Sequence, residues 1–217
     1  MTGTVFGVAE NGVEMECENT IAGLPMEISV NTLKNVDLSM MLTSPTGKTI
    51  SFDETSDKNG KIRMEIPEYH TLRAGEYSLS ARVSESAGEM QNACSFSVFP
   101  GELSVTKSLI ETDRKTAEAG SFENIVAHVK LVDNYLNPIK GHTVKLLSSR
   151  AEDEVQLLSS LPYTDDEGTI SFLVRSEEEG MSSLSALDLT EDMTISARAR
   201  IAFLSADKKA LGGENIE

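Results

Sequence analysis

The feature that most constrains the fold of this chain is a period-two alternation of apolar and polar residues in both of its halves. It is clear over residues 26–31, 61–66 and 77–83, and again over 128–131, 170–175 and 195–203. Successive side chains of a β-strand point to opposite faces, so each run predicts a strand with one face in a core and one in water. We find no long stretch with the three- and four-residue apolar spacing of an amphipathic helix. The chain is therefore predicted to be all-β.

Turn residues separate these runs at the intervals of about 8–12 residues that are typical of a β-sandwich. Ser44–Gly47 predicts a hairpin turn. Asp57–Gly60 and Asp165–Gly168 predict tight turns, because Asp hydrogen-bonds nearby backbone and Gly adopts positive φ. In Asn137-Pro138 the proline fixes φ in a connection between two strands.

An internal repeat links the two halves. Gly75-Glu76-Tyr77-Ser78-Leu79-Ser80-Ala81 aligns with Gly180-Met181-Ser182-Ser183-Leu184-Ser185-Ala186 at an offset of 105 residues, and the Asp57 turn aligns with the Asp165 turn at an offset of 108. Two tandem copies of one β-sandwich of about 100 residues explain this pattern better than one large domain. Pro100 and Gly101 end a strand, which predicts domains at 1–101 and 102–204. Residues 205–217 lack alternation and are expected to be a disordered tail.

The second half contains a longer diagnostic element. It begins with Asp133-Asn134, Asn137-Pro138-Ile139-Lys140-Gly141 and Val144-Lys145-Leu146. It continues with Thr164-Asp165, Gly168, Phe172, Gly180 and Leu184-Ser185-Ala186. On these residues, 102–204 resembles a bacterial immunoglobulin-like domain of the invasin/intimin type. The first half resembles immunoglobulin-like domains more loosely, through Ala22-Gly23-Leu24-Pro25 and Ala74-Gly75-Glu76-Tyr77.

The resemblance implies a non-catalytic module of a larger bacterial cell-surface or secreted protein, used as a spacer or in adhesion. Its partners would be neighbouring domains of the same protein or another protein, met through exposed strand edges. The family contributes no catalytic residue and no cofactor. Neither half has the Cys…Trp…Cys core of antibody-type domains.

Charge and hydropathy exclude other partners. The chain has 19 basic and 35 acidic side chains and a net charge of −16, and each half is net negative. Binding to nucleic acid depends on Lys and Arg that replace counterions, so nucleic acid is not an expected partner. No apolar run approaches the ~20 residues that span a bilayer, so this segment is not expected to insert into a membrane. The N-terminus lacks signal-peptide features, which leaves a fragment of an extracellular protein and a cytoplasmic protein both open.

Two cysteines, Cys17 and Cys94, fall in the first half, and neither belongs to a Cys-x-x-Cys pair. The expected first and last strands of that domain carry them, and these strands are neighbours in many immunoglobulin-like sandwiches. A disulfide would form in an oxidising compartment, and two buried free thiols are the alternative.

Tyr77 is expected to form a tyrosine corner, in which its hydroxyl bonds upstream backbone. The repeat places Ser182 at the aligned position, so the second domain must secure that corner differently. Pro138, Gly141 and Gly168 are expected to have structural roles as turn-formers.

Several acidic and histidine residues are candidate metal ligands. Asp165, Asp166 and Glu167, with Asp133 or Asp188, could bind Ca²⁺, but the alternating twelve-residue calcium loop is absent and a solvated turn is favoured. Glu177–Glu179 is expected to be an exposed loop. His70, His128 and His142 have no zinc-ligand spacing, and no nucleophile motif occurs. The chain is not expected to be an enzyme, and no metal site is expected in it. A carbohydrate- or calcium-binding accessory domain and an intracellular or phage assembly protein remain the alternatives.

Overall fold

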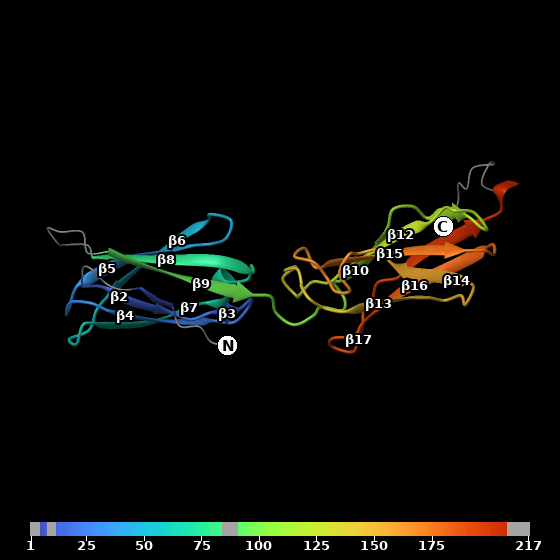
Figure 1. Ribbon diagram of the computed structural model, residues 1–217. Coiled ribbons are helices and arrows are strands. Elements are labelled where there is room, and N and C mark those ends of the chain that lie inside the picture. The colour runs from blue at the N-terminus through green and yellow to red at the C-terminus, as the bar shows by residue number, and fades with distance from the viewer. Residues whose placement is uncertain (1–4, 8–11, 84–90, 208–217) are drawn as a thin grey trace. The chain divides into compact units, whose positions relative to one another are not determined.

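The computed structural model describes residues 5–7, 12–83 and 91–207. Contacts divide the chain into two compact units, Met1–Gly101 (unit 1) and Glu102–Glu217 (unit 2). Among the described residues the elements are strands, apart from a 3-10 turn η1 at Glu68–His70. The predicted all-β class is confirmed, and each unit has two facing sheets (Figure 1).

Unit 1 pairs a four-stranded sheet with a five-stranded one. Sheet I has the order β1 (Val5–Gly7), β2 (Glu14–Cys17), β4 (Met26–Asn31), β7 (Lys61–Ile66). Sheet II has the order β3 (Thr20–Ile21), β9 (Gln91–Phe99), β8 (Gly75–Val83), β5 (Asp37–Thr43), β6 (Thr49–Thr55). Only β3 and β9 run parallel among these paired strands.

Unit 2 has a similar arrangement. Sheet III has the order β10 (Leu109–Thr112), β12 (Ile125–Lys130), β15 (Thr169–Ser176), β14 (Asp153–Leu157). Sheet IV has the order β11 (Thr116–Glu118), β18 (Ala199–Leu204), β16 (Gly180–Asp188), β13 (Val144–Ser148), and β17 (Met193–Thr194) also pairs with β16. The pairing of β11 with β18 is parallel, as for β3 with β9.

The cores follow from the alternation in the sequence. In β8 the side chains of Tyr77, Leu79, Ala81 and Val83 are buried, and the residues between them face outward. The same pattern holds in β12, where Ile125, Ala127 and Val129 are all 0% exposed. Each unit therefore buries its own apolar cluster between its two sheets.

One predicted strand is wrong in its extent. The alternation over residues 195–203 predicts a continuous strand, but β18 begins only at Ala199. The N–H of Ile195 donates to the carbonyl of Ala186 at 3.1 Å, whereas the N–H of Ser196 donates to the carbonyl of Val105 at 2.8 Å. Because successive residues bond to different segments, no single ladder forms there.

Few residues separate the last strand of unit 1 from the first pairing in unit 2. Strand β9 ends at Phe99, and Leu103 already bridges Asp133 within unit 2. The last strand ends at Leu204, and the predicted tail at 205–217 lies outside the described residues from 208 onward. Within the described ranges, no helix has the length and apolar character to cross a membrane.

Candidate functional site

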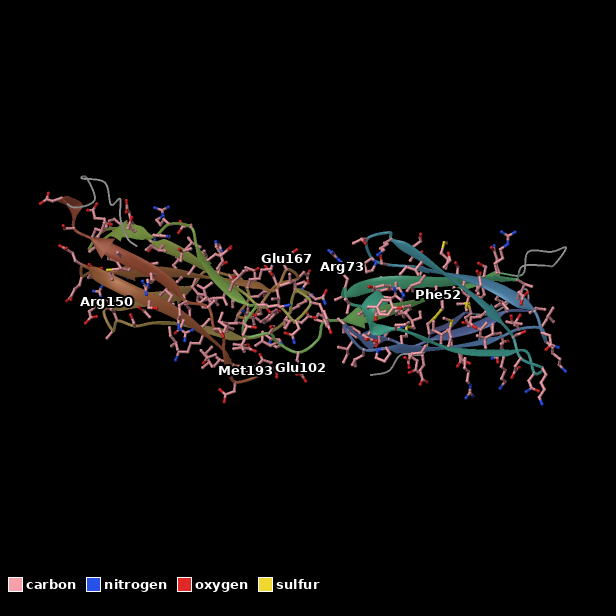
Figure 2. All side chains as sticks on the ribbon, turned by 180° about the vertical axis from the view of Figure 1, so that it is seen from behind. Phe52, Arg73, Glu102, Arg150, Glu167 and Met193 are labelled. Carbon is pink, nitrogen blue, oxygen red and sulfur yellow. A yellow bond between two sulfur atoms is a disulfide. The ribbon has the colours of Figure 1, made fainter. Side chains whose placement is uncertain are left out.

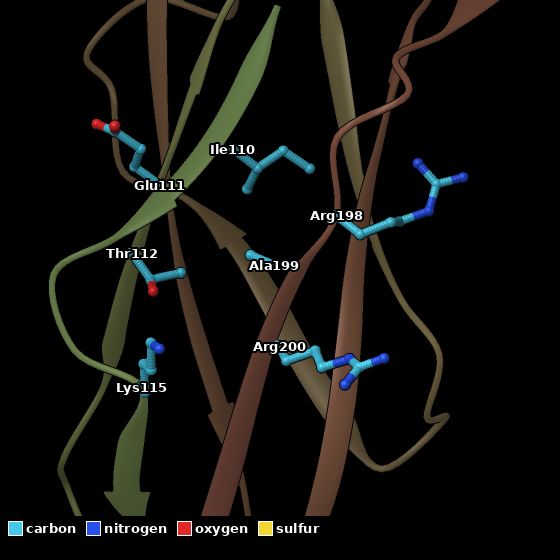
Figure 3. A pocket seen from close by; sticks show the side chains of 7 residues that line it. All are labelled: Ile110, Glu111, Thr112, Lys115, Arg198, Ala199 and Arg200. Atoms are coloured by element: carbon cyan, nitrogen blue, oxygen red, sulfur yellow. The ribbon is translucent and has the colours of Figure 1, made fainter. Parts of the chain in front are cut away.

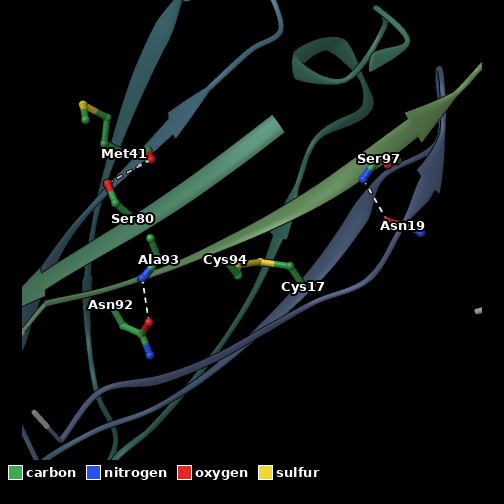
Figure 4. Close-up of a disulfide and its surroundings, with 8 residues drawn as sticks. All are labelled: Cys17, Asn19, Met41, Ser80, Asn92, Ala93, Cys94 and Ser97. Carbon is green, nitrogen blue, oxygen red and sulfur yellow. Dashed lines mark hydrogen bonds between the residues drawn. A yellow bond between two sulfur atoms is a disulfide. The ribbon is translucent and has the colours of Figure 1, made fainter. Parts of the chain in front are cut away.

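The two cysteines meet across the sandwich of unit 1. Cys17 of β2 and Cys94 of β9 are joined by a disulfide between sheets I and II, with Cα atoms 6.2 Å apart (Figure 4). Both residues are buried, at 0% and 4% exposure. We use the term seam for the side of the sandwich where β2 of sheet I faces β9 of sheet II.

Hydrogen bonds flank this bridge along the seam. The amide of Asn92 in β9 donates to the carbonyl of Val13 at 2.7 Å. Further along β9, the N–H of Ser97 donates to the Asn19 side-chain oxygen at 2.8 Å (Figure 4). The seam of unit 1 is therefore held at three points by covalent and polar contacts.

Tyr77 has the geometry of a tyrosine corner. Its hydroxyl donates to the carbonyl of Arg73 at 3.0 Å, and its ring is 2% exposed and stacks on Phe96 with centroids 5.4 Å apart. Burial raises the pKa of the Tyr77 hydroxyl above its ordinary value, although the bond to Arg73 opposes that shift. The contact fastens the loop before β8 to the strand itself.

Unit 2 secures the aligned corner with a buried polar cluster. The Asp153 carboxylate accepts hydrogen bonds from the hydroxyls of Ser182 and Ser148. The bond from Ser148 Oγ to Asp153 Oδ2 is 2.5 Å long. The guanidinium of Arg150, which Figure 2 labels, lies 3.8 Å from the Asp153 carboxylate and donates to the carbonyl of Glu178 at 3.2 Å. Asp153 is 0% exposed and Arg150 is 16% exposed in its side chain, so the cluster is an internal support. Sequence reasoning missed Arg150 and Asp153, and the only signal was the serine at the place of Tyr77.

The two Asp-x-x-Gly turns have the same hydrogen bonds. Asp57 Oδ1 accepts the N–H of Asn59 at 2.7 Å and of Lys61 at 2.8 Å. Asp165 Oδ1 accepts the N–H of Glu167 at 3.1 Å and of Thr169 at 2.8 Å. These bonds stabilise the turns and direct Oδ1 of Asp57 and of Asp165 to backbone donors.

The glycines of these turns fit against backbone. Gly60 and Gly168 have φ of +79° and +72°. A Cβ on Gly60 would lie 2.1 Å from the carbonyl oxygen of Thr32, and one on Gly168 would lie 2.5 Å from that of Leu131. Both turns thus require glycine for its conformation and for space.

The Asp133–Gly141 block is a turn built around one buried carboxylate. Asp133 Oδ1 accepts the N–H of Tyr135 at 2.7 Å and of Asn137 at 2.9 Å, and Asp133 Oδ2 accepts the Asn137 amide at 2.8 Å. Pro138 bridges Val132, and the N–H of Gly141 donates to the carbonyl of Thr164 at 2.9 Å. Pro138 and Gly141 thus both take part in the backbone pairings of this segment.

The candidate calcium ligands Asp166 and Asp188 each contact a different basic side chain. Asp166 pairs with Lys140, whose pKa that contact raises, and Asp188 accepts from His142 Nδ1 at 2.8 Å. Over residues 5–7, 12–83 and 91–207, no three His, Cys, Asp or Glu side chains come together in a way that could hold a metal ion. Glu177–Glu179 are exposed.

The three histidines also lie in different surroundings. His70 packs against the rings of Phe52 and Tyr69, and burial lowers its pKa. His128 Nδ1 lies 2.8 Å from Ser171 Oγ on the outer face of sheet III. Glu111 is the cross-strand neighbour of His128, but no hydrogen bond joins them within the described part of the chain. Among the residues that the structure describes, this serine–histidine contact has no hydrogen-bonded carboxylate of the kind that orients the histidine of a catalytic triad.

These two-layered units have the fold of bacterial immunoglobulin-like domains of the invasin/intimin type, which confirms the resemblance at the level of fold. The adhesin FdeC of Escherichia coli superposes with a TM-score of 0.64 at 14% identity, over 94% of this chain and 66% of that one. InvD of Yersinia pseudotuberculosis gives a TM-score of 0.55 at 12% identity, over 86% and 55%. Invasin, a bacterial integrin-binding protein, gives 0.49 at 13% identity, over 94% and 39%.

The chain therefore spans between 39% and 66% of the length of these three solved chains. No protein-family model matches the sequence, and no curated protein is significantly similar to it. The likeness is one of fold, because sequence identity is low throughout.

Proposed function

We propose that this chain is a non-catalytic structural module, a spacer or adhesion segment, of a larger bacterial cell-surface or secreted protein. The observation that carries the proposal is the similarity of fold to the adhesin FdeC over 94% of the chain. The polar contacts support it, because the buried Asp, Arg, Tyr and Asn side chains described above bond to backbone or to each other. They stabilise turns and corners rather than form a reactive group.

The segment that connects the two units is short. Only Pro100, Gly101 and Glu102 separate the last residue of β9 from Leu103, which is 9% exposed and bridges Asp133. Long flexible linkers are rich in Gly and Ser and many residues in length, and this connection is neither. We propose that the partners of this chain are neighbouring domains of the same protein, or another protein.

Surface labelling tests the location. Antibodies against residues 12–207 should label intact cells of the source bacterium, and external protease should remove the label. Labelling that needs permeabilised cells would contradict the proposal and favour the cytoplasmic alternative.

Domain replacement separates spacer from adhesion segment. The parent protein would carry two unrelated immunoglobulin-like domains of equal length in place of residues 12–207. Retained adhesion of whole cells would indicate a spacer, and lost adhesion with normal surface display would indicate direct contact with the adhesion partner.

A further inference from the structure

Unit 2 has a seam on the corresponding side, where β10 of sheet III faces β18 of sheet IV, and no disulfide closes it because both cysteines of the chain lie in unit 1. Between β10 and β18 lies a cleft of about 560 Å³ (Figure 3). Its lining is made of residues from both sheets and from the crossover between β10 and β11: Ile110, Glu111, Thr112, Lys115, Arg198, Ala199 and Arg200. At the corresponding place in unit 1, the Cys17–Cys94 bridge joins the two strands.

The cleft exposes part of a strand edge. The N–H of Ala202 donates to the carbonyl of Lys115 at 2.9 Å, so Ala202 directs its backbone groups towards β11. Because direction alternates along a strand, the N–H and C=O of Arg200 point to the same edge. No backbone hydrogen bond to Arg200 on that side is found within the described residues, since β11 begins only at Thr116, opposite Ala202.

The upstream limit of this free edge is set by a side chain. The Arg198 guanidinium donates to the carbonyls of Ile195 and Ala197 at 2.7 and 2.9 Å, so these acceptors are already satisfied. At the other end Lys115 already bonds Ala202, so the open stretch runs from Arg198 to Arg200 and would accommodate about three or four residues of an added strand.

The charge of the cleft is opposite to that of the chain. Lys115, Arg198 and Arg200 outnumber Glu111, in a protein of net charge −16. The side chains of Arg198, which directly precedes β18, and of Arg200 in β18 extend away from β10 (Figure 3). A strand added to this edge would place every second side chain beside them as a cross-strand neighbour, where opposite charges attract.

The alternate side chains of an added strand would meet an apolar surface. Ile110 is 8% exposed and Ala199 is partly buried, and both line the cleft towards the core of unit 2. A strand with one acidic and one apolar face matches both sides of this edge.

We propose that the unit 2 seam binds an extended peptide segment of alternating acidic and apolar residues, which adds to β18 as an additional strand. The backbone groups of Arg200 bond the segment, Arg198, Arg200 and Lys115 attract its acidic side chains, and Ile110 and Ala199 contact its apolar ones. The inference deepens the protein-interaction role proposed above. It fails separately from that role, because a spacer with a closed seam would still be a spacer.

Peptide titration of the full chain tests the proposal. The probe is acetyl-(Glu-Val)₃-amide, and the charge-reversed acetyl-(Lys-Val)₃-amide is its control. We expect millimolar or tighter binding of the acidic peptide, with amide NMR shifts concentrated at Lys115 and residues 198–201. Equal binding of both peptides, shifts centred elsewhere, or no binding at several millimolar would overturn the proposal.

Variants separate charge from backbone pairing. Arg200→Glu should weaken binding of the acidic peptide about fivefold to tenfold, because it replaces attraction by repulsion across the strands. Lys145→Glu, an equal charge change on β13 at the opposite edge of sheet IV, should change it less than about twofold. Arg200→Pro removes an edge N–H without breaking the β16 ladder and should abolish binding if the amide spectrum stays dispersed. Unchanged affinity in Arg200→Glu would contradict the site.

A second copy of the chain is the competing occupant. Sedimentation velocity of the chain alone should show a monomer. A dimer that Arg200→Glu dissociates would show that self-association, and not a peptide segment, covers this edge.

Discussion

The two units support the same corner with different side chains. In unit 1 the Tyr77 hydroxyl bonds the carbonyl of Arg73, and in unit 2 the Arg150 guanidinium bonds the carbonyl of Glu178. Residues 73 and 178 are 105 positions apart, the offset of the internal repeat. Both units thus place a hydrogen-bond donor at this carbonyl, and a different kind of side chain supplies it in each.

The units also differ in the sheet that one strand joins, β6 in unit 1 and β14 in unit 2. In unit 1, β6 forms a hairpin with β5 in sheet II, whereas in unit 2 the corresponding β14 pairs with β15 in sheet III. The Ser44–Lys48 turn closes the hairpin with backbone bonds. At the start of β14, the buried Asp153 carboxylate bonds Ser148 and Ser182 of sheet IV while its backbone pairs with sheet III. A strand of similar place in the sequence thus joins opposite sheets.

Removing the disulfide is the strongest way to break the comparison. Cys17→Ala with Cys94→Ala should lower the free energy of unfolding of unit 1 by about 4 kcal/mol, because a long loop is no longer closed in the unfolded chain. Calorimetry should show the transition of unit 1 shifted and that of unit 2 unchanged. Mass spectrometry with and without reductant is the control, and two free thiols in oxidatively produced protein would contradict the bridge.

Substitution of Arg150 tests the corner of unit 2. Arg150→Met should lower the free energy of unfolding of unit 2 by about 3 kcal/mol, because it leaves the fully buried Asp153 without a nearby cation. Tyr77→Phe, the matched change in unit 1, should cost about 1 kcal/mol, since it removes a single neutral hydrogen bond. Urea unfolding measures both. Equal losses would show that the Arg150–Asp153 pair contributes no more than the tyrosine.

The Asp-x-x-Gly turns should respond alike, which sharpens the similarity of the units. Gly60→Ala and Gly168→Ala should each cost about 2 kcal/mol, because both glycines have positive φ and a Cβ would press on a carbonyl oxygen. Gly47→Ala is a control for conformation alone, since φ is +80° there and nothing lies within 4 Å of its Cβ position. If Gly47→Ala cost as much as the other two, close approach to the backbone would not matter.

The smallest expected effect is a pH dependence in unit 1. Backbone N–H donors from Lys61 and Asn59 lower the pKa of Asp57 below its ordinary value near 3.8. A lowered folded-state pKa means that the carboxylate stabilises unit 1 above about pH 4, and that this part is lost as the pH falls through the lowered pKa. Denaturation midpoints at pH 7 and pH 3 should therefore differ less in Asp57→Asn than in the unchanged chain. An identical pH dependence would assign the effect to other groups.

Much of the fold could be predicted from neighbouring residues. The alternation in β8 and β12 and the Asp57 and Asp165 turns are confirmed because side-chain periodicity and turn chemistry act over a few residues. The run from Ile195 to Phe203 misled because Ile195 and Ser196 bond to two different segments, at Ala186 and at Val105. The cluster of Arg150 and Asp153 was not predicted, since nothing local marks an arginine as buried.

What the sequence by itself determined is the all-β class, the turns and the relation between the two halves, because these depend on local patterns of polarity. The tertiary structure decided which sheet β6 and β14 join, which side chain holds each corner, and that one seam is bridged and the other open. The physical reason is that these features depend on contacts between residues far apart in the chain, such as Arg150 with Glu178 and Cys17 with Cys94.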